Sequence, residues 1–302
     1  MDRVSTRGST APVKNPMTCK NPYCIEMGAE LSDPFGNVAE AFSRAAEKYD
    51  RFAEDHPNLA RMREKVYEHL SRHLAPGARI LELNAGTGTD AVHLARSGYS
   101  VHATDIAPGM LQRLQDKVDR AGLAERVVVQ NCSFTALEAV RGGPFDAVFS
   151  NLGGLNCIPD LRPVIAQLPL ALAPGGTVTW VLMPRVCLWE LGLVFTGDFK
   201  VATRRLSGSG TLAHLEGKRF MIYYYTPQQV VAAFRPGYQL LEIEGLSVFA
   251  PPAESKNLAL KYPSLYRRLC WLDDRLAHRP PFYGWGDFFI ATFRYQPEDL
   301  TS

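Results

Sequence analysis

The stretch "ILELNAGTGTDAVHLAR", residues 80–96, decides the fold prediction for this chain. It begins as an apolar run of strand length, passes through Gly86-Thr87-Gly88 and ends in a helical pattern. A glycine turn between a strand and a helix lets the backbone approach a nucleotide-like ligand closely. The string from Gly86 to Ala91 also fits the G-x-G-x-x-A pattern of dinucleotide sites. The glycines alone therefore do not decide which ligand the turn serves.

Strands and helices alternate from this stretch onward. The strand-length runs are 79–84, 100–105, 126–131, 145–151 and 177–183, followed later by 239–249 and 287–295. Helical stretches at 90–98, 107–122 and 160–176 lie between the first five runs, except between the third and the fourth. This alternation predicts a parallel sheet with helices on both faces. We therefore expect an α/β fold with a doubly wound, mostly parallel seven-stranded sheet and a cap inserted between the fifth and sixth strands.

The composition of the flanking segments predicts the domain organisation. Residues 1–32 are rich in Ser, Thr, Pro, Asn and Lys, which is typical of a flexible leader. Residues 33–302 are expected to form a single domain, because 302 residues suit one large α/β unit. Within it, 33–76 carries two amphipathic helices expected to cover the glycine turn. Residues 184–238 form the cap, where "SGSG" and "EGK" predict the turns of β-hairpins.

The chemistry that the composition excludes also guides the prediction. The formal net charge is only +2, so no strong basic field points to nucleic acid. The six cysteines are scattered without the spacing of a metal site, so we expect no metal. The N-terminus lacks an apolar signal region, and the longest apolar run, "TVTWVLM", is too short to span a bilayer. We expect a soluble cytoplasmic protein.

Two acids near the turn bear on the ligand. Glu82 lies near the end of the first predicted strand, four residues before Gly86. A carboxylate there would repel a pyrophosphate, whereas it would favour a ligand that carries positive charge. Asp105 closes the second predicted strand and can accept hydrogen bonds from both hydroxyls of a ribose. Asp105 supports adenosine binding in general and does not distinguish between cofactors.

The combined order of motifs resembles the class I S-adenosylmethionine-dependent methyltransferases, in particular the small-molecule branch. The motifs are "ILELNAGTG", "ATD", "FDAVFSN" and "LAPGG", and the resemblance covers roughly residues 38–182 with the final strands also fitting. The family pattern at the first turn is acid-x-Gly-x-Gly-x-Gly. Asn84 replaces its first glycine here, and Asn tolerates left-handed backbone angles better than most residues.

The resemblance implies a role for each matching residue toward S-adenosylmethionine. Glu82 would orient the turn and the ammonium of the cofactor, and Asp105 would hold its ribose. Asn84, Gly86, Gly88 and Asn151 would lie beside its methionine part. The adenine would pack on Ile106 and meet Cys132 or Ser133, since the acid that the family often has there is absent. Tyr49 would close the site from the N-terminal helix.

The resemblance also implies the reaction, which is methyl transfer to a small organic molecule. The aromatic and aliphatic residues of the cap favour a partly apolar or aromatic acceptor. His214 is the candidate general base and Asn156 the candidate for positioning the acceptor. The absence of an "NPPY"-type string after the fourth strand argues against nucleic-acid bases as acceptors. Two alternatives stay open: an NAD(P)-dependent oxidoreductase that uses the same glycines, and a non-catalytic protein that binds S-adenosylmethionine.

Overall fold

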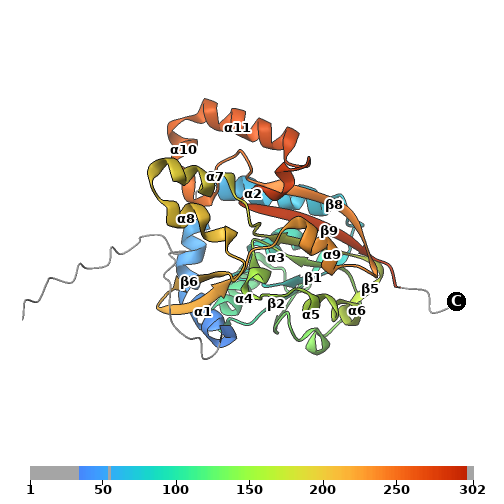
Figure 1. Cartoon of the computed structure of the whole chain (residues 1–302). Coiled ribbons are helices and arrows are strands. Elements are labelled where there is room, and N and C mark those ends of the chain that lie inside the picture. The colour runs from blue at the N-terminus through green and yellow to red at the C-terminus, as the bar shows by residue number, and fades with distance from the viewer. Residues whose placement is uncertain (1–33, 54–55, 298–302) are drawn as a thin grey trace, which may run out of the picture.

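The structure is a computed structural model, and it describes residues 34–53 and 56–297 (Figure 1). The predicted leader, residues 1–32, lies outside the described residues. The cap of 184–238 and the helices of 33–76 can be followed in the structure, apart from residues 33, 54 and 55.

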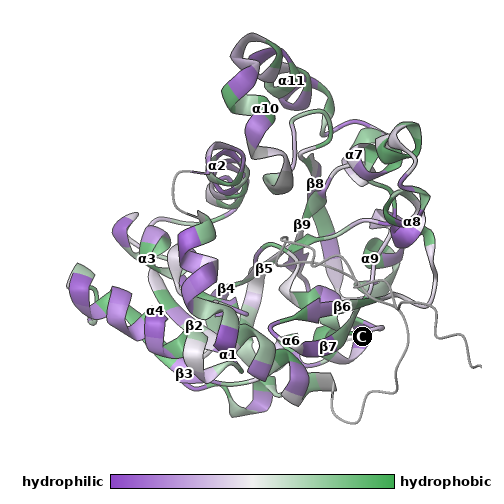
Figure 2. Cartoon of the chain, turned by 90° about the vertical axis from the view of Figure 1, so that its left-hand side faces the viewer, coloured by the Kyte–Doolittle hydropathy of each residue, from purple (hydrophilic) through white to green (hydrophobic). Residues whose placement is uncertain are grey.

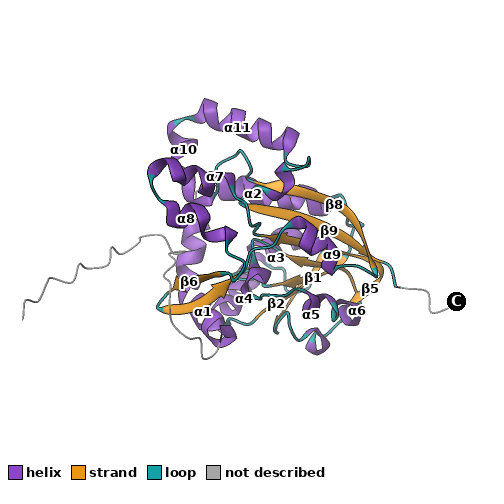
Figure 3. Cartoon of the chain, in the orientation of Figure 1, coloured by secondary structure: helices purple, strands orange, loops and turns teal. Residues whose placement is uncertain are grey.

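A seven-stranded sheet forms the centre of the molecule (Figures 1 and 3). Its spatial order is β3-β2-β1-β4-β5-β9-β8. The first five strands in the chain are parallel, whereas β9 pairs antiparallel with both β5 and β8. This arrangement confirms the predicted fold class. The strands are β1 (Arg79–Leu83), β2 (Ser100–Asp105), β3 (Val127–Asn131), β4 (Phe145–Ser150), β5 (Leu172–Leu182), β8 (Tyr238–Leu246) and β9 (Phe288–Tyr295).

Helices cover both faces of this sheet. The longer ones are α1 (Pro34–Ala53), α2 (Pro57–Ser71), α3 (Thr89–Arg96), α4 (Pro108–Ala121) and α11 (Pro263–Leu276). The shorter ones are α5 (Arg162–Ile165), α6 (Leu168–Ala171), α7 (Leu188–Leu191), α8 (Phe199–Thr203), α9 (Pro227–Ala233) and α10 (Lys256–Lys261). Prolines in the first turn of α2, α4 and α9 suit positions whose N–H has no partner within the helix.

Alternate side chains of the buried strands supply two separate cores. Leu81 and Leu83 of β1 point to the face covered by α5, α6 and α9. Ile80 points to the other face, where it packs with apolar residues of α2, α3 and α4. Both faces of β1 are therefore apolar, as a parallel strand at the centre of a sheet requires. Its carboxyl end is fixed between two packed layers, and the glycine turn follows from this end.

Two local predictions were wrong. The predicted single helix at 160–176 is two short helices, α5 and α6, and "LAPGG" lies inside β5 rather than before it. A register shift between Phe145 and Ala147 accommodates this early start of β5. In the cap, one hairpin forms, β6 (Thr211–Leu215) with β7 (Lys218–Ile222), while 188–206 is helical. "SGSG" precedes this hairpin, and Glu216 and Gly217 make its turn.

The cap is attached to the rest of the chain by charge and by apolar contact. Glu190 of α7 binds Arg204 and Arg205, and Arg205 in turn binds Asp287 just before β9. The hairpin packs on α1 through a small apolar cluster that includes Ala45 and Phe220. A capping box begins α9, with Thr226 and Gln229 each bonded to the other's backbone. The cap therefore joins α1 to the start of β9.

Two side-chain groups in the described part of the chain have the spacing of metal ligands. They are His69, His73 and Glu242, and Cys187, Glu190 and Asp287. Arginines already bind the carboxylates of both groups, Arg72 in the first and Arg204 and Arg205 in the second. We therefore interpret both as ion-pair networks that join elements. No helix within residues 34–53 and 56–297 has the length and apolar content that a membrane span requires.

Candidate active site

The glycine turn lies at the carboxyl end of β1 and has three left-handed residues. Asn84, Gly86 and Gly88 have φ angles of 56°, 56° and 79°. The structure thus places Asn84 in the left-handed conformation that its sequence position requires. Gly88 also needs its missing side chain, because a Cβ there would lie 2.5 Å from Cγ of Leu114. The turn therefore packs directly against α4 and leads into α3.

Asp105 ties this turn to the end of β2. Its two carboxylate oxygens accept hydrogen bonds from the amides of Gly86, at 2.9 Å, and Ala107, at 2.8 Å. Burial raises the pKa of Asp105, and these two amide bonds oppose that shift. A carboxylate has about four acceptor positions, so capacity remains for the hydroxyls of a ligand.

Helix α1 lies over the turn and is fastened to it by polar contacts. Asp50 accepts a hydrogen bond from Oγ1 of Thr87 at 2.5 Å and binds Nζ of Lys117 at 2.6 Å. Lys117 also donates to Oγ1 of Thr87 at 3.0 Å. Tyr49, the preceding residue, lines the cavity at the turn. Asp50 therefore fixes this part of α1 against the turn, and Tyr49 is thereby held at the cavity.

A buried ion pair forms the opposite wall. Arg63 of α2 binds Asp90 of α3, and both side chains are at most one-tenth exposed. Tyr67 donates to Asp90, and Nδ2 of Asn151 donates to its other oxygen at 3.0 Å. Burial opposes ionisation of Asp90, but the charge of Arg63 and these hydrogen bonds hold the pKa of Asp90 below its ordinary value. Asn151 is thereby oriented by α3 rather than by its own loop alone.

Glu82 is buried behind the turn and lacks a full set of partners. Its side chain is almost fully buried, and Oε2 has no hydrogen-bond partner among the described residues. Burial raises the pKa of Glu82 well above its ordinary value, and the negative charge of Asp90 adds to this shift. Arg63 acts in the opposite direction, and its Nε also lacks a partner within the described part of the chain. Unpartnered buried polar groups of this kind are costly, and they are common at binding sites.

The cavity at the turn brings together four of the ten predicted cofactor residues. Tyr49, Asn84, Gly86 and Asn151 line it, together with Arg63, Ala85, Thr87, Thr89, Asp90 and Leu152. Its volume is about 30 Å³, which is enough for a water molecule. Glu82, Gly88 and Asp105 support the turn from behind and do not line the cavity.

The three residues predicted to meet an adenine lie beside Asp105. Ile106 follows it directly and is half-buried. The amide of Cys132 donates to the carbonyl oxygen of Asp105 at 3.1 Å. The hydroxyl of Ser133 bonds to that of Thr135 at 2.7 Å and accepts from the Thr135 amide. The amide of Cys132 is thus already used, whereas the Ser133 hydroxyl retains capacity for a further bond.

Asn156 does not have the position that an acceptor-binding residue needs. It is fully buried, and its Oδ1 accepts from the amide of Met183 at 3.0 Å. Its Nδ2 donates to the carbonyl oxygens of Tyr223, at 2.6 Å, and Met183, at 3.3 Å. Backbone groups therefore occupy both ends of its amide, and we correct its predicted role. Asn156 joins the loop after β4 to the end of β5 and to the cap.

His214 lies on β6, opposite Arg219 of β7. Neighbours Ala213 and Leu215 pack on α1, so alternation places His214 on the other face of the hairpin. It is half-buried, and it does not line the cavity at the turn. Its predicted role as a base stays a prediction.

Sequence reasoning missed four polar residues of this site, namely Asp50, Arg63, Thr87 and Asp90. One of them had a recognisable signal. Arg63 is four residues after Leu59 and seven before Leu70, so it lies within the apolar stripe of its helix. A cation at such a position is buried and needs a partner. The other three are short polar residues at positions where the sequence pattern predicts exposure to solvent. Only their contacts in the tertiary structure identify them.

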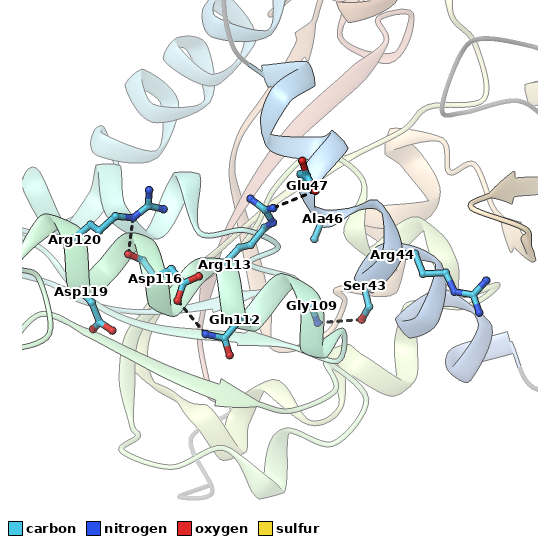
Figure 4. Close-up of a pocket in the computed structure, with 10 residues that line it drawn as sticks. All are labelled: Ser43, Arg44, Ala46, Glu47, Gly109, Gln112, Arg113, Asp116, Asp119 and Arg120. Carbon is cyan, nitrogen blue, oxygen red and sulfur yellow. Dashed lines mark hydrogen bonds and ion pairs between the residues drawn. The ribbon is translucent and has the colours of Figure 1, made fainter.

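A larger depression of about 850 Å³ lies between α1 and α4 (Figure 4). Its walls are mostly charged or polar, and many of these side chains interact with one another. Arg120 binds the carbonyl oxygen of Asp116, and the amide of Gly109 binds the hydroxyl of Ser43. It holds no histidine, cysteine or tyrosine among its described lining residues, so we assign the chemistry to the cavity at the turn.

Comparisons with known proteins agree with this fold. Residues 80–176 match the sequence model of a family described as a methyltransferase domain. In its fold and in this matched segment, the chain is similar to the class I S-adenosylmethionine-dependent methyltransferases. The matches to the first curated relatives span only 37% to 63% of those proteins.

Two relatives and one solved structure illustrate the range of similar proteins. The malonyl-[acyl-carrier protein] O-methyltransferase of Halorhodospira halophila is 30% identical over 193 residues, covering 57% of this chain and 63% of that protein. The tRNA 5-carboxymethoxyuridine methyltransferase of Escherichia coli K12 is 22% identical over 224 residues, covering 72% and 79%. The structure of Burkholderia thailandensis 1,6-didemethyltoxoflavin-N1-methyltransferase, with bound 1,6-didemethyltoxoflavin and S-adenosylhomocysteine, has a TM-score of 0.53 at 17% identity, covering 91% of this chain and 95% of that chain.

Proposed function

We propose that the glycine turn binds S-adenosylmethionine and that the protein transfers its methyl group to a small organic molecule. One observation carries the choice of cofactor, the buried carboxylate of Glu82 with an oxygen that lacks a partner among the described residues. An anionic pyrophosphate would be repelled at this place, whereas the ammonium of S-adenosylmethionine would supply the missing partner and a compensating charge. The runner-up, an NAD(P)-dependent oxidoreductase, places a pyrophosphate at this turn and therefore fits less well.

The residues around the cavity fit the other groups of this cofactor. Arg63, whose Nε has no partner among the described residues, would bind the carboxylate, and Asn151 would lie beside the same end. Asp105 has acceptor capacity for the ribose hydroxyls, and Ile106 and Ser133 adjoin it for the adenine. The cavity volume of about 30 Å³ is far below that of a nucleoside, so binding requires α1 to move away from the turn.

The bound cofactor supplies a methyl group that its sulfonium already activates. The chain therefore needs to align the acceptor and to exclude water rather than to form a covalent intermediate. Tyr49 and α1 would close the cavity after binding, held by Asp50, Thr87 and Lys117. For an acceptor that loses a proton, His214, on the face of the hairpin that points away from α1, is our candidate base.

We propose that the cap, residues 184–238, selects a small, partly apolar or aromatic acceptor. Its hairpin contacts α1, and its helical part is fixed to the start of β9 by Arg205 and Asp287. The first contact is with α1, which lies over the glycine turn. The second is at the start of β9, beside the carboxyl end of β5. The tRNA methyltransferase among the relatives makes RNA the competing acceptor class.

Calorimetry of the full chain with S-adenosylmethionine, S-adenosylhomocysteine and NADH tests the cofactor. We expect the protein to bind S-adenosylmethionine and S-adenosylhomocysteine but not NADH. Asp105→Ala should abolish binding of the first two ligands. Asp119→Ala is the matched control, because Asp119 is an exposed acid on the neighbouring α4. Tight binding of NADH alone would refute the proposal.

Transfer of a labelled methyl group tests the acceptor. Purified protein is incubated with labelled cofactor and with either the small-molecule fraction or the tRNA fraction of a cell extract. We expect label in the small-molecule fraction. Label in the tRNA fraction would show that the acceptor is RNA and not a small molecule. If the cofactor binds and neither fraction is labelled, the result favours the alternative of a non-catalytic protein that binds S-adenosylmethionine.

A further inference from the structure

Helices α10 and α11 present an outer face on which apolar side chains are exposed to solvent. The pair projects from the body of the molecule at the end opposite α5 and α6 (Figure 1). Leu260, Tyr262, Leu265 and Trp271 are 63%, 61%, 47% and 53% exposed. Hydrophilic and hydrophobic segments alternate along both helices (Figure 2). Large exposed apolar side chains gathered on one face are typical of an interaction surface.

On helices α10 and α11, the acidic and the basic side chains lie on different faces. Residues 257–279 hold five Lys or Arg and two Asp, a formal charge of +3 where the whole chain has only +2. Both acids face the body of the protein. Asp273 accepts the amides of Val248 and Phe249, and Asp274 binds Arg61 and Lys65 of α2. The inner face is therefore fixed and electrically compensated.

The cations lie on the outer face with the apolar residues. Lys261, Arg267, Arg268, Arg275 and Arg279 are all exposed. None of them forms an ion pair with any residue that the structure describes. Arg275 instead lies over the ring of Trp271, with Cζ 4.6 Å from the ring centroid. The outer face thus combines uncompensated positive charge with an aromatic and aliphatic surface.

A second exposed apolar segment lies at the same end of the molecule. It connects α7 and α8, and both views place these helices on the side of the molecule that carries α10 (Figures 1 and 2). Phe195 is 94% exposed and Phe199 is 62% exposed. Asp198 and Lys200 are the exposed charged residues beside them, and their charges are opposite. Two separate projections of one molecule therefore offer aromatic rings in the same general direction, whereas the uncompensated cations lie on the first of them.

We propose that this end of the molecule, formed by α10, α11 and the segment between α7 and α8, docks on the surface of an anionic lipid bilayer. The surface projects outward, whereas a protein partner's helix would need a groove. Aromatic rings interleaved with Lys and Arg match the boundary between lipid headgroups and acyl chains, where rings insert and cations contact phosphates. Trp271 would insert beside Arg275, and Phe195 would insert from the other projection.

Flotation of the full chain with lipid vesicles tests this docking. We expect binding to vesicles of phosphatidylglycerol and little binding to vesicles of phosphatidylcholine. Added salt should weaken the binding, because it screens charges at a surface. Reversal of two cations in Arg267→Glu/Arg268→Glu should lower the partition coefficient at least about 25-fold, at about fivefold for each cation. Trp271→Ser and Phe195→Ser should each lower it as well.

Matched controls separate docking from a general effect of surface changes. Leu170 on α6 is 63% exposed, the same fraction as Leu260, and lies at the opposite end of the molecule. Leu170→Ser should leave vesicle binding unchanged, whereas Leu260→Ser should weaken it. All variants should bind S-adenosylmethionine as the unaltered chain does, so that failure of docking and failure of the proposed function are distinguishable.

Three outcomes would overturn the proposal. Equal binding to the two kinds of vesicle would remove the role of charge, and equal loss in Leu170→Ser would remove the role of this face. Sedimentation showing self-association that Trp271→Ser abolishes, without vesicle binding, would assign the face to a second copy of the chain.

Discussion

Asn84 lies directly against Gly154, from the loop after β4. A Cβ on residue 154 would come within 2.6 Å of Cβ of Asn84, which is closer than real contacts of this kind. The glycine turn after β1 and the loop after β4 therefore fit only because residue 154 has no side chain. The first glycine of the family pattern has become Asn at 84, and the space for its side chain is found at 154.

This contact predicts the effect of Gly154→Ala. The added methyl group should lower the free energy of unfolding by about 1–3 kcal/mol, as overpacking does. Asn84→Gly should restore space, so the double variant Asn84→Gly/Gly154→Ala should lose much less than the single one. Chemical denaturation measures all three variants. Gly192→Ala is the control, since nothing lies within 4 Å of a Cβ at Gly192. Additive losses in the double variant would show that the two residues do not interact.

Glu82→Gln should stabilise the protein and weaken cofactor binding. Burial and the charge of Asp90 raise the pKa of Glu82, so the folded chain holds this proton more tightly than the unfolded chain. The contribution of Glu82 to stability therefore falls as pH rises above about 4.3 and is unfavourable at neutral pH. The amide that replaces the carboxyl group in this variant carries no charge, so it should remove this loss. The free energy of unfolding as a function of pH measures it.

The same substitution should lower the affinity for S-adenosylmethionine about tenfold or more, the value of a charge-assisted hydrogen bond. In the unaltered chain, affinity should rise with pH, because binding a cation favours the ionised form of Glu82. Calorimetry across pH reads both effects. Glu138→Gln, at an exposed position, serves as the control. Unchanged affinity in Glu82→Gln would remove the observation on which the cofactor assignment rests.

Arg63→Met should be among the most damaging single substitutions in the chain. It leaves Asp90 buried and ionised without its partner, which costs about 3–5 kcal/mol. Arg51→Met breaks the exposed pair with Glu47 and should cost at most about 1 kcal/mol. Thermal and chemical unfolding compare the two variants. A similar loss in both would mean that burial of the Arg63–Asp90 pair has no energetic consequence.

Asp50→Asn should loosen the closure of α1 without removing a cofactor contact. The amide side chain of this variant can keep a hydrogen bond to Thr87 but lacks the charge that binds Lys117. We expect S-adenosylhomocysteine to dissociate up to about fivefold faster, in line with the strength of a partly exposed ion pair. Surface plasmon resonance measures the dissociation rate. Glu64→Gln, at an exposed position on α2, should leave the rate unchanged, and an equal change in both would contradict a specific role of Asp50.

The central part of the fold could be predicted from the sequence because its signals are local. Each strand is a short apolar run, each helix has a stripe, and Gly86 and Gly88 mark a turn whose backbone angles few other residues adopt. The cap could not be predicted as well. Residues 188–206 are helical through contacts of Glu190 with Arg204 and Arg205, which lie fourteen and fifteen positions further along the chain.

Some residues of the candidate site could likewise be predicted from local sequence signals, and others could not. Glu82, Asn84 and Asp105 could be singled out because they stand at the ends of predicted strands, where a parallel sheet gathers its polar residues. Asn156 lies in the loop after the fourth strand, and its amide is taken up by backbone groups of Met183 and Tyr223. Nothing near it in the sequence reveals those groups, so its expected role was wrong.

The sequence by itself determined the sheet, its mostly parallel arrangement and the turn that follows β1, because hydrophobic periodicity and glycine angles act over a few residues. Only the tertiary structure decided which charges meet. Arg63 finds Asp90, Asp50 finds Thr87 and Lys117, and Oε2 of Glu82 finds no partner among the described residues. Pairing of buried charges depends on distances between elements that pack from far apart in the chain, and those distances set both the electrostatics of the site and the place where a cation is needed.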